Sequence, residues 1–261
     1  MLNFLYRLVS QMGAFIVDTI WQLGFAVHFL AQILWHSKKT FFRPILISQN
    51  IYFSGVLSLL ITLISSLFVG MVLGLQSYHV LLRFGSPNAL GAMVAVALLR
   101  ELGPVLSALL FAGRAGSAIT AGIGLMKATE QLDAMRAMAV DPIDHVIAPK
   151  FWGIVIAVPI LASMFNVVGI LGSYIVGVLM VGLDHGIFWS QIAMQVDWHV
   201  DIVNGLIKSI TFGINMAWIA IFKGYTAVPT AEGVAQATTQ TVVLSALSVL
   251  ALDFILTAFM F

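Results

Sequence analysis

The sequence has no cysteine and few charged residues. Among its 261 residues are 12 Lys and Arg and 11 Asp and Glu, so charged residues make up 9% of the chain. An average soluble domain carries about 25%. Without cysteine, the chain can form no disulfide bridge, thiolate nucleophile or cysteine-based metal site. The formal net charge of +1 provides no basic surface of the kind that nucleic acid requires, so we expect no nucleic-acid partner.

Motifs for catalysis and nucleotide hydrolysis are also missing. The chain has no G-x-S-x-G elbow, no H-E-x-x-H pair and no G-x-x-x-x-G-K-[ST] phosphate loop. We therefore expect no enzymatic activity and no cofactor on this chain. If ATP drives it, the hydrolysis must happen on another polypeptide.

Long apolar runs are what the chain has in abundance. Hydrophobic residues make up 61% of the sequence, and the mean hydropathy is +1.04. A helix needs about 20 apolar residues to cross the hydrocarbon core of a bilayer. Such runs predict an all-α integral membrane protein with five spans in a single domain, residues 1–261. The predicted spans are residues 51–75, 89–124, 151–181, 202–222 and 242–261.

The N-terminal segment, residues 1–35, has a different pattern. Its apolar residues recur every three or four positions, while Arg7, Gln11, Asp18 and Gln22 gather on another face. This pattern predicts a helix that lies in the membrane interface. The alternative is a first spanning helix, because the segment is long enough and only sparsely charged.

The basic residues predict the orientation. Lys38, Lys39 and Arg43 precede the first span, and further Lys and Arg residues cluster around the connection between spans two and three, whereas the intervening loops hold only Arg83. Lys and Arg are enriched on the cytoplasmic side. The connection at residues 127–145 is therefore predicted to be cytoplasmic, and the C-terminus is predicted to lie on the outer side. Asp197, His199 and Asp201 approach the spacing of metal ligands, but their outer loop favours a solvated turn, and we predict no metal site.

The cytoplasmic connection contains a short amphipathic pattern that ends at Asp141-Pro142. One face carries apolar residues and the other carries charges: Leu132, Met135 and Ala139 on the first, and Glu130, Asp133 and Arg136 on the second. This helix either lies on the membrane face of its own chain or fits a groove on a cytoplasmic partner. In the second case Met135 and Met138 provide adaptable contacts.

Charged residues inside a span are costly and favour a functional site. Besides Arg114, which lies nearer the cytoplasmic side, the predicted spans contain Arg100, Glu101, Lys208 and Asp253. Arg100 and Glu101 are adjacent, so their side chains project about 100° apart on a helix and each needs a different partner. Arginine can hold a phosphate through charge-assisted hydrogen bonds. Lys208 and Asp253 are two further buried charges that could pair with each other. The alternative for all of them is a purely structural role. Pro104 predicts a kink beside Arg100 and Glu101.

Several stretches together resemble the MlaE family of ABC-transporter permeases. They are "GMVLGLQ" (70–76), "LLRELGPVLSALLFAGRAGSAITAGIGLMKATEQLDAM" (98–135), "MAVDP" (138–142), "KGYTAVPTAEGVAQATTQTVV" (223–243) and "LDFILTAFMF" (252–261). The resemblance implies a permease subunit of the bacterial inner membrane that moves phospholipid to a periplasmic carrier and maintains outer-membrane lipid asymmetry. It implies a homodimer with an MlaF-like ATPase that binds ATP, an MlaB-like STAS protein and an MlaD-like periplasmic hexamer.

The resemblance also implies roles for individual residues. The segment that couples the permease to the ATPase would contain Glu130, Gln131, Leu132, Asp133, Met135, Arg136 and Met138. The lipid cavity, which opens outward between two protomers, would be lined by Leu73, Val80, Leu81, Phe84, Arg100 and Leu102. Phe84 departs from a tyrosine in a close relative and lacks its hydroxyl.

Two other functional classes stay open from the residues alone. An ATP-independent secondary transporter or channel would use the buried charges as an ion or proton relay. Five spans without an evident inverted repeat argue against it. A structural anchor for a periplasmic complex would tolerate the loss of both Arg100 and Glu101.

Overall fold

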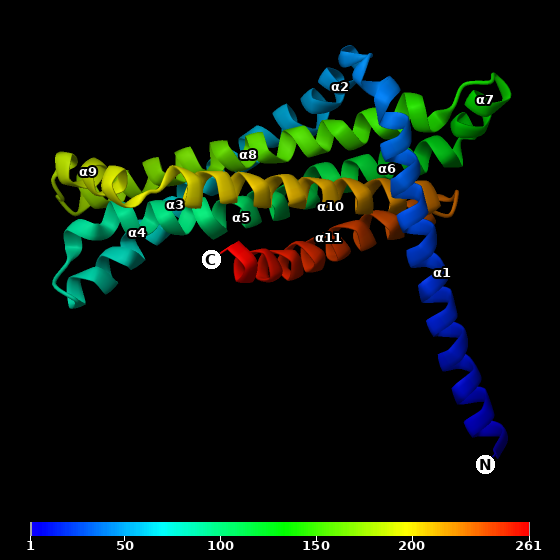
Figure 1. The fold of residues 1–261 in the computed structure, drawn as a ribbon, viewed down its shortest axis with the longest axis horizontal. Coiled ribbons are helices and arrows are strands. Elements are labelled where there is room, and N and C mark those ends of the chain that lie inside the picture. The colour runs from blue at the N-terminus through cyan, green and yellow to red at the C-terminus, as the bar shows by residue number, and fades with distance from the viewer. Residues whose placement is uncertain (1, 261) are drawn as a thin grey trace.

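Long helices lie side by side, and one further helix crosses an end of the bundle (Figure 1). The structure is a computed structural model that describes the backbone of residues 2–260 and the side chains of residues 17–260, except those of residues 18, 19, 22, 23 and 39. The described residues form helices and no strand. Five of these helices are long and apolar enough to cross a membrane. The all-α fold with five spanning helices is confirmed.

The spanning helices are longer than the apolar runs that predict them. They cover Pro44–Arg83, Pro87–Ala128, Ile143–Met180, Trp198–Thr226 and Ala231–Met260. Helical hydrogen bonding does not stop where the hydrocarbon ends, so helices continue into polar sequence on both sides. The polar interruption expected after residue 75 is helical as far as Arg83.

Short π-helical turns interrupt several spans and divide them into labelled pieces. The first span contains α2 (Pro44–Ile51) and α3 (Leu57–Arg83), joined by a π turn at Tyr52–Val56. The second contains α4 (Leu90–Ala97), α5 (Gly103–Phe111) and α6 (Ser117–Ala128), with π turns at Leu98–Leu102 and Ala112–Gly116. The remaining spans contain α8 (Ala148–Tyr174), α10 (Asn204–Thr226) and α11 (Ala231–Met260).

The turn at Leu98–Leu102 shows how the chain accommodates Pro104. Proline has no N–H to donate, and its ring clashes with the carbonyl of the residue four positions earlier. Here the N–H of Gly103 bonds to the carbonyl of Leu98, one residue further back than in an α-helix, and Pro104 occupies the first turn of α5. The break expected at Pro104 therefore takes the form of a π turn that contains Arg100 and Glu101.

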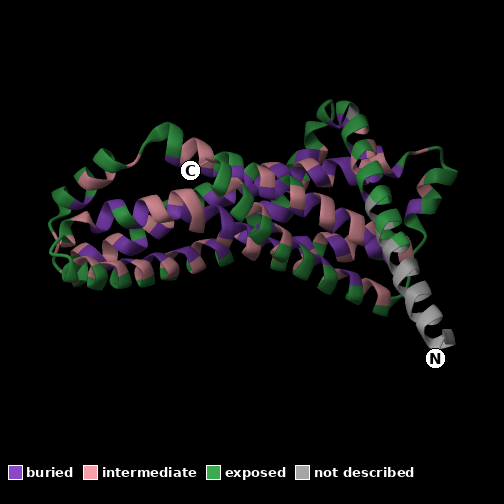
Figure 2. Cartoon of the chain, turned by 60° about the horizontal axis from the view of Figure 1, so that its bottom comes forward, coloured by how far each residue is buried: buried purple, intermediate pink, exposed green. Residues whose placement is uncertain are grey.

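The spans pack closely where glycines allow their backbones to meet. A Cβ on Gly70 of α3 would lie 1.9 Å from the carbonyl oxygen of Gly169 in α8, and one on Gly74 would lie 3.0 Å from the Cα of Ser173. The GxxxG motif of the first span thus packs against the third span of the same chain. Figure 2 shows buried residues where the helices face one another and exposed residues on the outer sides.

Helix α1 (Leu2–Phe41) runs across the bundle instead of alongside the spans (Figure 1). Its described part is anchored by two indole N–H groups. Trp218 donates to the carbonyl of Ala26 at 2.9 Å, and Trp152 donates to the Ser37 hydroxyl at 2.7 Å. Among the described residues, α1 is not one of the helices long and apolar enough to span a membrane. Its place in the interface stays a prediction, and the side chains of its expected polar face, Arg7 to Gln22, lie outside the described residues.

Candidate functional site

Arg100 and Glu101 turn to different partners, as their angular separation requires. Arg100 Nε donates to Asp201 Oδ1, and Asp201 Oδ2 accepts the backbone N–H of Asp197 at 2.8 Å. The Asp201 side chain is completely buried, whereas 35% of the Arg100 side chain stays exposed. The expectation that this loop is a solvated turn is therefore wrong for Asp201, since the carboxylate is withdrawn from solvent to neutralise a guanidinium.

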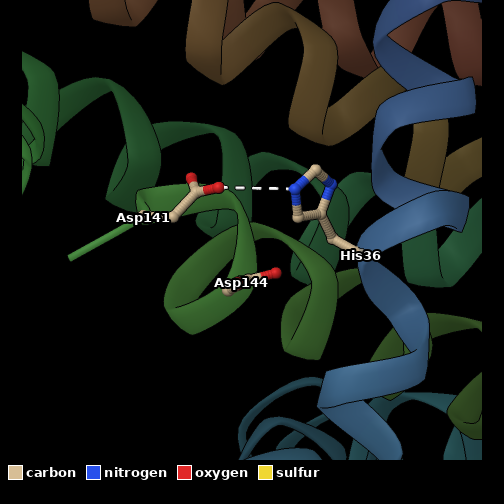
Figure 3. A group of neighbouring side chains, drawn as sticks. All are labelled: His36, Asp141 and Asp144. Atoms are coloured by element: carbon tan, nitrogen blue, oxygen red, sulfur yellow. Dashed lines mark ion pairs between the residues drawn. The ribbon is translucent and has the colours of Figure 1, made fainter. Parts of the chain in front are cut away.

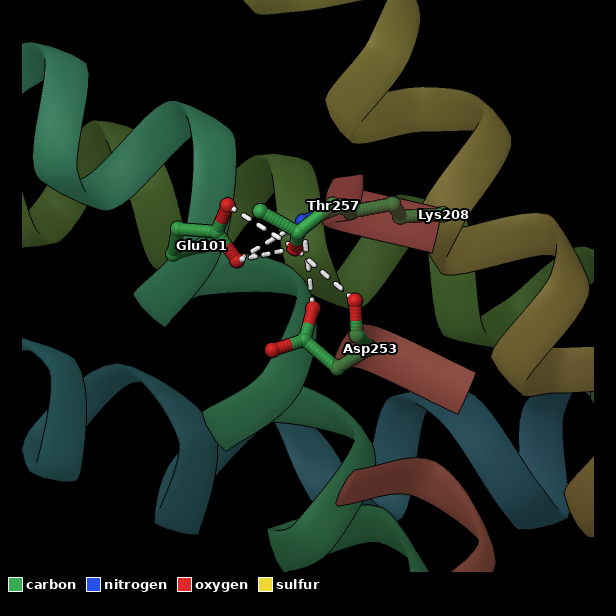
Figure 4. Close-up of polar contacts among 4 residues, drawn as sticks. All are labelled: Glu101, Lys208, Asp253 and Thr257. Carbon is green, nitrogen blue, oxygen red and sulfur yellow. Dashed lines mark hydrogen bonds and ion pairs between the residues drawn. The ribbon is translucent and has the colours of Figure 1, made fainter. Parts of the chain in front are cut away.

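Glu101 joins a second cluster, formed with Lys208, Asp253 and Thr257 (Figure 4). Lys208 Nζ lies 2.7 Å from Glu101 Oε2, 3.1 Å from Asp253 Oδ1 and 2.7 Å from Thr257 Oγ1. The Lys208 side chain has no exposed surface. A fully buried ammonium is tolerated only with close anionic and polar partners. The cluster thus ties the second span to the fourth and fifth.

The sequence analysis named three of the four members of this cluster and missed Thr257. It named Asp201 only as part of an outer turn and did not pair it with Arg100. Thr257 was not singled out because a threonine is unremarkable in an apolar helix. Its position four residues after Asp253, on the same helical face, was a usable signal. Asp201 had a signal as well, because it opens the fourth span on the predicted outer side, near the level of Arg100.

A cavity of about 560 Å³ adjoins these charges. Its walls are mainly apolar side chains from the end of the first span and the start of the second, together with Gln191 and Gln195 of α9 (His185–Gln195). Arg100 and Glu101 also line it. An apolar chamber with two charged groups in its wall suits an amphiphile whose polar end approaches Arg100.

The structure separates the six residues expected at a lipid cavity into three groups. Leu81 and Arg100 line the cavity. Leu73 and Leu102 pack against the buried cluster of Leu90, Val94, Leu98 and Phe165. Val80 and Phe84 are 41% and 79% exposed and lie outside this cavity's lining. One chain therefore brings together only part of the expected set.

The expected coupling segment is a short helix, α7 (Gln131–Ala137), preceded by Glu130 in the left-handed conformation with φ 58°. Leu132 is 3% exposed and packs on its own chain, whereas Met138 is 68% exposed. Gln131, Asp133 and Arg136 are also exposed. The helix ends at Ala137, before the expected stop at Asp141-Pro142. Ala139 has φ 59° and does not extend the face of Leu132.

Tyr225, near the end of α10, connects α7 to three other elements. Its hydroxyl accepts a hydrogen bond from Arg136 Nη2 of α7. Its carbonyl accepts one from Lys127 Nζ of α6 at 2.9 Å, and its ring stacks on Phe29 of α1 with centroids 4.9 Å apart. Tyr225 therefore joins α7 to α10, the helix that carries Lys208.

His36 of α1 faces two carboxylates from the segment that follows α7 (Figure 3). Its Nε2 lies 3.5 Å from Asp141 Oδ2, and its Nδ1 lies 2.8 Å from the carbonyl of Gln32. With Asp144, these residues offer three ligand atoms within 4.8 Å of one another. Arg43 Nη1 bonds to the neighbouring His145. The group joins α1 to the start of the third span.

Asp197 caps the helix of the fourth span. Its Oδ1 accepts the backbone N–H groups of Val200 at 3.2 Å and His199 at 2.8 Å. These two bonds hold the pKa of the Asp197 carboxyl below its usual range, because they favour the ionised form. Asp197 thus supports Asp201, and through it Arg100, from the end of the helix.

Comparison with known proteins gives one family. The model of the family Permease MlaE matches residues 47–259. The intermembrane phospholipid transport system permease protein MlaE of Haemophilus influenzae is 53% identical over 97% of this chain and 97% of its own length. A probable ABC transporter permease protein of Rickettsia typhi is 35% identical over 83% of each chain. The chloroplastic protein TRIGALACTOSYLDIACYLGLYCEROL 1 of Arabidopsis thaliana is 35% identical over 82% of this chain and 61% of its own length.

The relatives from Haemophilus influenzae and Rickettsia typhi are permeases by name, and five apolar helices here can span a bilayer. The protein is accordingly a multi-pass protein of the inner membrane, and its chain belongs to the MlaE family of ABC-transporter permeases.

Proposed function

We propose that this chain is the permease subunit of an ATP-driven transporter that moves phospholipid between the inner membrane and a periplasmic carrier. This transport would maintain the lipid asymmetry of the outer membrane. The observation that carries the proposal is the apolar cavity of about 560 Å³ whose wall contains Arg100 and Glu101. The name of the Haemophilus influenzae relative, an intermembrane phospholipid transport system permease protein, supports phospholipid as the cargo.

The permease acts as a homodimer whose second copy completes the cavity. Only 22% of the most apolar stretch of the first span is buried within one chain, and Val80 and Phe84 are exposed near its end. A second protomer would cover such an apolar face. In the dimer, Val80 and Phe84 extend the lipid-contacting surface that Leu81 and Arg100 begin.

ATP is bound and hydrolysed by an MlaF-like partner, which receives α7. The exposed residues of this segment, among them Glu130, Asp133 and Met138, contact the ATPase, while buried Leu132 holds α7 to its own chain. An MlaB-like protein accompanies the ATPase, and an MlaD-like hexamer receives the lipid on the periplasmic side. The permease itself needs no cofactor.

Two side-chain contacts link α7 to the cavity and provide a path by which ATP hydrolysis can drive transport. Closure of the ATPase moves α7, and the Arg136–Tyr225 contact passes that movement to α10. Lys208 on α10 holds Glu101 in the π turn of the second span. Displacement of α10 thus moves the turn that carries Arg100, which narrows the cavity and expels the acyl chains. Arg100 orients the phosphate of the lipid by charge-assisted hydrogen bonds.

Replacement of Arg100 tests the cargo contact. In vesicles that contain the complete transporter, Arg100→Ala is expected to lower the rate of phospholipid transfer by at least about tenfold, because one charge-assisted contact is lost. Arg83→Ala, at the exposed end of α3, is the matched control and should keep the wild-type rate. If the Arg100→Ala complex assembles and transfers lipid at the wild-type rate, Arg100 does not contact the phosphate.

A second test concerns the ATPase. The tagged chain, purified in mild detergent, should bring an ATPase subunit with it. Glu130→Lys reverses an exposed charge at the start of α7 and should lose or uncouple that subunit. Absence of any ATPase from intact membrane complexes would contradict the proposal.

The cluster around Lys208 favours one alternative, an ion-coupled secondary transporter. One ammonium lies between the carboxylates of Glu101 and Asp253, an arrangement that a proton relay could use. This alternative predicts transport that depends on a proton gradient and continues without ATP.

A further inference from the structure

A small pocket at the opposite end of the second span contains two cationic side chains and no carboxylate. Its volume is about 220 Å³, and Arg114 and Lys150 line it together with Asn50, Ser54, Phe53 and Leu57. Arg114 lies 14 residues after Arg100, which corresponds to about 20 Å along a helix. The pocket is therefore separate from the cavity that contains Arg100 and Glu101.

The two cationic side chains differ in their contacts. Arg114 Nη1 donates to the carbonyl of Phe53 at 2.9 Å and to the Ser58 hydroxyl at 3.2 Å. The Phe53 carbonyl belongs to the π turn at Tyr52–Val56, so Arg114 is fixed in place by the backbone. Within the part of the chain that the structure describes, Lys150 has no hydrogen bond or ion pair. A partly buried ammonium beside a guanidinium, without a carboxylate in the lining, is a site for an anion.

The position of the pocket indicates which anion. Arg43 precedes the first span, Asn50 directly precedes the apolar run that begins at residue 51, and Lys150 lies in the first turn of α8. The positive-inside rule assigns this end of the bundle to the cytoplasm. Phe53 and Leu57 continue from the pocket toward the membrane and are 65% and 47% exposed. The pocket thus combines two cationic side chains with exposed apolar side chains near the expected depth of the lipid headgroups. This combination matches a phospholipid better than a soluble ion.

We propose that this pocket binds the phosphate of a phospholipid from the cytoplasmic leaflet. Lys150 and Arg114 contact the phosphate, and Phe53 and Leu57 contact the first part of an acyl chain. The inference rests on the proposed function only for the class of ligand. A transporter with this site holds lipid at the cytoplasmic end of the second span as well as in the outer cavity.

Binding of three probes to the purified, delipidated transporter tests the proposal. Dioctanoyl phosphatidylglycerol has both phosphate and chains, dioctanoylglycerol has chains only, and glycerol phosphate has phosphate only. Lys150→Met should weaken phosphatidylglycerol binding about fivefold, the worth of one basic residue near an anionic lipid. Lys150→Arg should restore it, and Lys38→Met, which removes an exposed lysine outside the pocket, should leave it unchanged.

The other outcomes overturn the proposal in distinguishable ways. If Lys150→Met binds phosphatidylglycerol as wild type does, the pocket is not a lipid site. If glycerol phosphate binds equally well and depends equally on Lys150, the site takes a soluble phosphate. If dioctanoylglycerol binds as tightly as phosphatidylglycerol, the cations make no contribution. Loss of ATP-driven transfer together with intact Lys150-dependent lipid binding would defeat the proposed function and leave this site standing.

Discussion

The ammonium of Lys208 contacts polar side chains from two other spans, and the Lys208 side chain is completely buried. Its ammonium lies within 3.1 Å of an oxygen from each of Glu101, Asp253 and Thr257. Glu101 and Asp253 are themselves only 34% and 21% exposed. Their mutual repulsion is therefore balanced by one cation, and the stability of the bundle depends on that cation being present.

Replacement of Lys208 by methionine tests this dependence. Lys208→Met keeps the length of the side chain but leaves two carboxylates together, so we expect a loss of about 3 kcal/mol in the free energy of unfolding. Thermal unfolding in detergent measures it. Adding Glu101→Gln and Asp253→Asn to Lys208→Met should recover part of the loss. An unchanged unfolding temperature in Lys208→Met would contradict the account.

At the residue scale, sequence reasoning found the costly charges but not all their partners. Adjacent positions on a helix sufficed to show that Arg100 and Glu101 need different partners. Which partners these were depends on how the π turn at Leu98–Leu102 rotates the two side chains, and periodicity does not reveal such a turn. Asp201 was placed in a solvated turn because its loop position suggested contact with water, so its pairing with Arg100 was not predicted.

At the scale of elements, the contact between α3 and α8 depends on glycine. A Cβ at Gly70 would lie 1.9 Å from the carbonyl oxygen of Gly169, which is backbone and cannot move aside. We expect Gly70→Ala to destabilise the protein by about 2 kcal/mol or more in thermal unfolding. Gly122→Ala is the matched control, because nothing lies within 4 Å of its added Cβ. Equal unfolding temperatures for the two variants would contradict close packing of α3 on α8.

The link between α7 and α10 can be weakened without disturbing the ring of Tyr225. Tyr225→Phe removes the hydrogen bond from Arg136 but keeps the stacking on Phe29. We expect ATP-driven lipid transfer to fall about threefold, the worth of a modest hydrogen bond, while ATPase assembly is retained. Tyr52→Phe, whose hydroxyl has no bond in the described structure, should transfer lipid at the wild-type rate. Wild-type transfer by Tyr225→Phe would show that motion reaches α10 by another route.

The cap of the fourth span predicts a pH dependence. The pKa of Asp197 is lowered from its ordinary 3.8 by the backbone N–H groups that its carboxylate accepts. Its stabilising effect is therefore fully present above pH 3.8 and is lost as the pH falls through the lower folded value. The difference in unfolding temperature between wild type and Asp197→Asn should shrink over that acidic range. A difference that is independent of pH would exclude an ionised cap.

The sequence predicted the spanning helices correctly but not the residues at which they begin and end. Apolar runs longer than a bilayer is thick identify spanning helices, because only a helix satisfies the backbone there. The ends were misplaced because helices such as α3 continue into polar sequence as far as Arg83. The amphipathic helix after the second span was expected to reach Asp141, yet left-handed Ala139 follows soon after its end at Ala137.

At the scale of the whole molecule, the described chain leaves apolar surface uncovered on α3 and α11. Only 11% of the most apolar stretch of α11 is buried within the chain. Lipid covers such a face in a monomer, and a second copy can cover part of it in a dimer. Val80 and Phe84, near the end of α3, are 41% and 79% exposed within one chain. In the proposed dimer two chains share the site, and a pattern within one chain does not locate such a site.

The most direct test of the account is ATP-dependent transfer of phospholipid. Vesicles that contain the chain with its co-purified partners and a fluorescent phospholipid would be mixed with acceptor carrier, and transfer would be followed with and without ATP. We predict transfer that requires ATP, persists when the proton gradient is collapsed, and falls in Arg100→Ala. Transfer that proceeds without ATP and stops when the proton gradient is collapsed would contradict the account and favour an ion-coupled transporter.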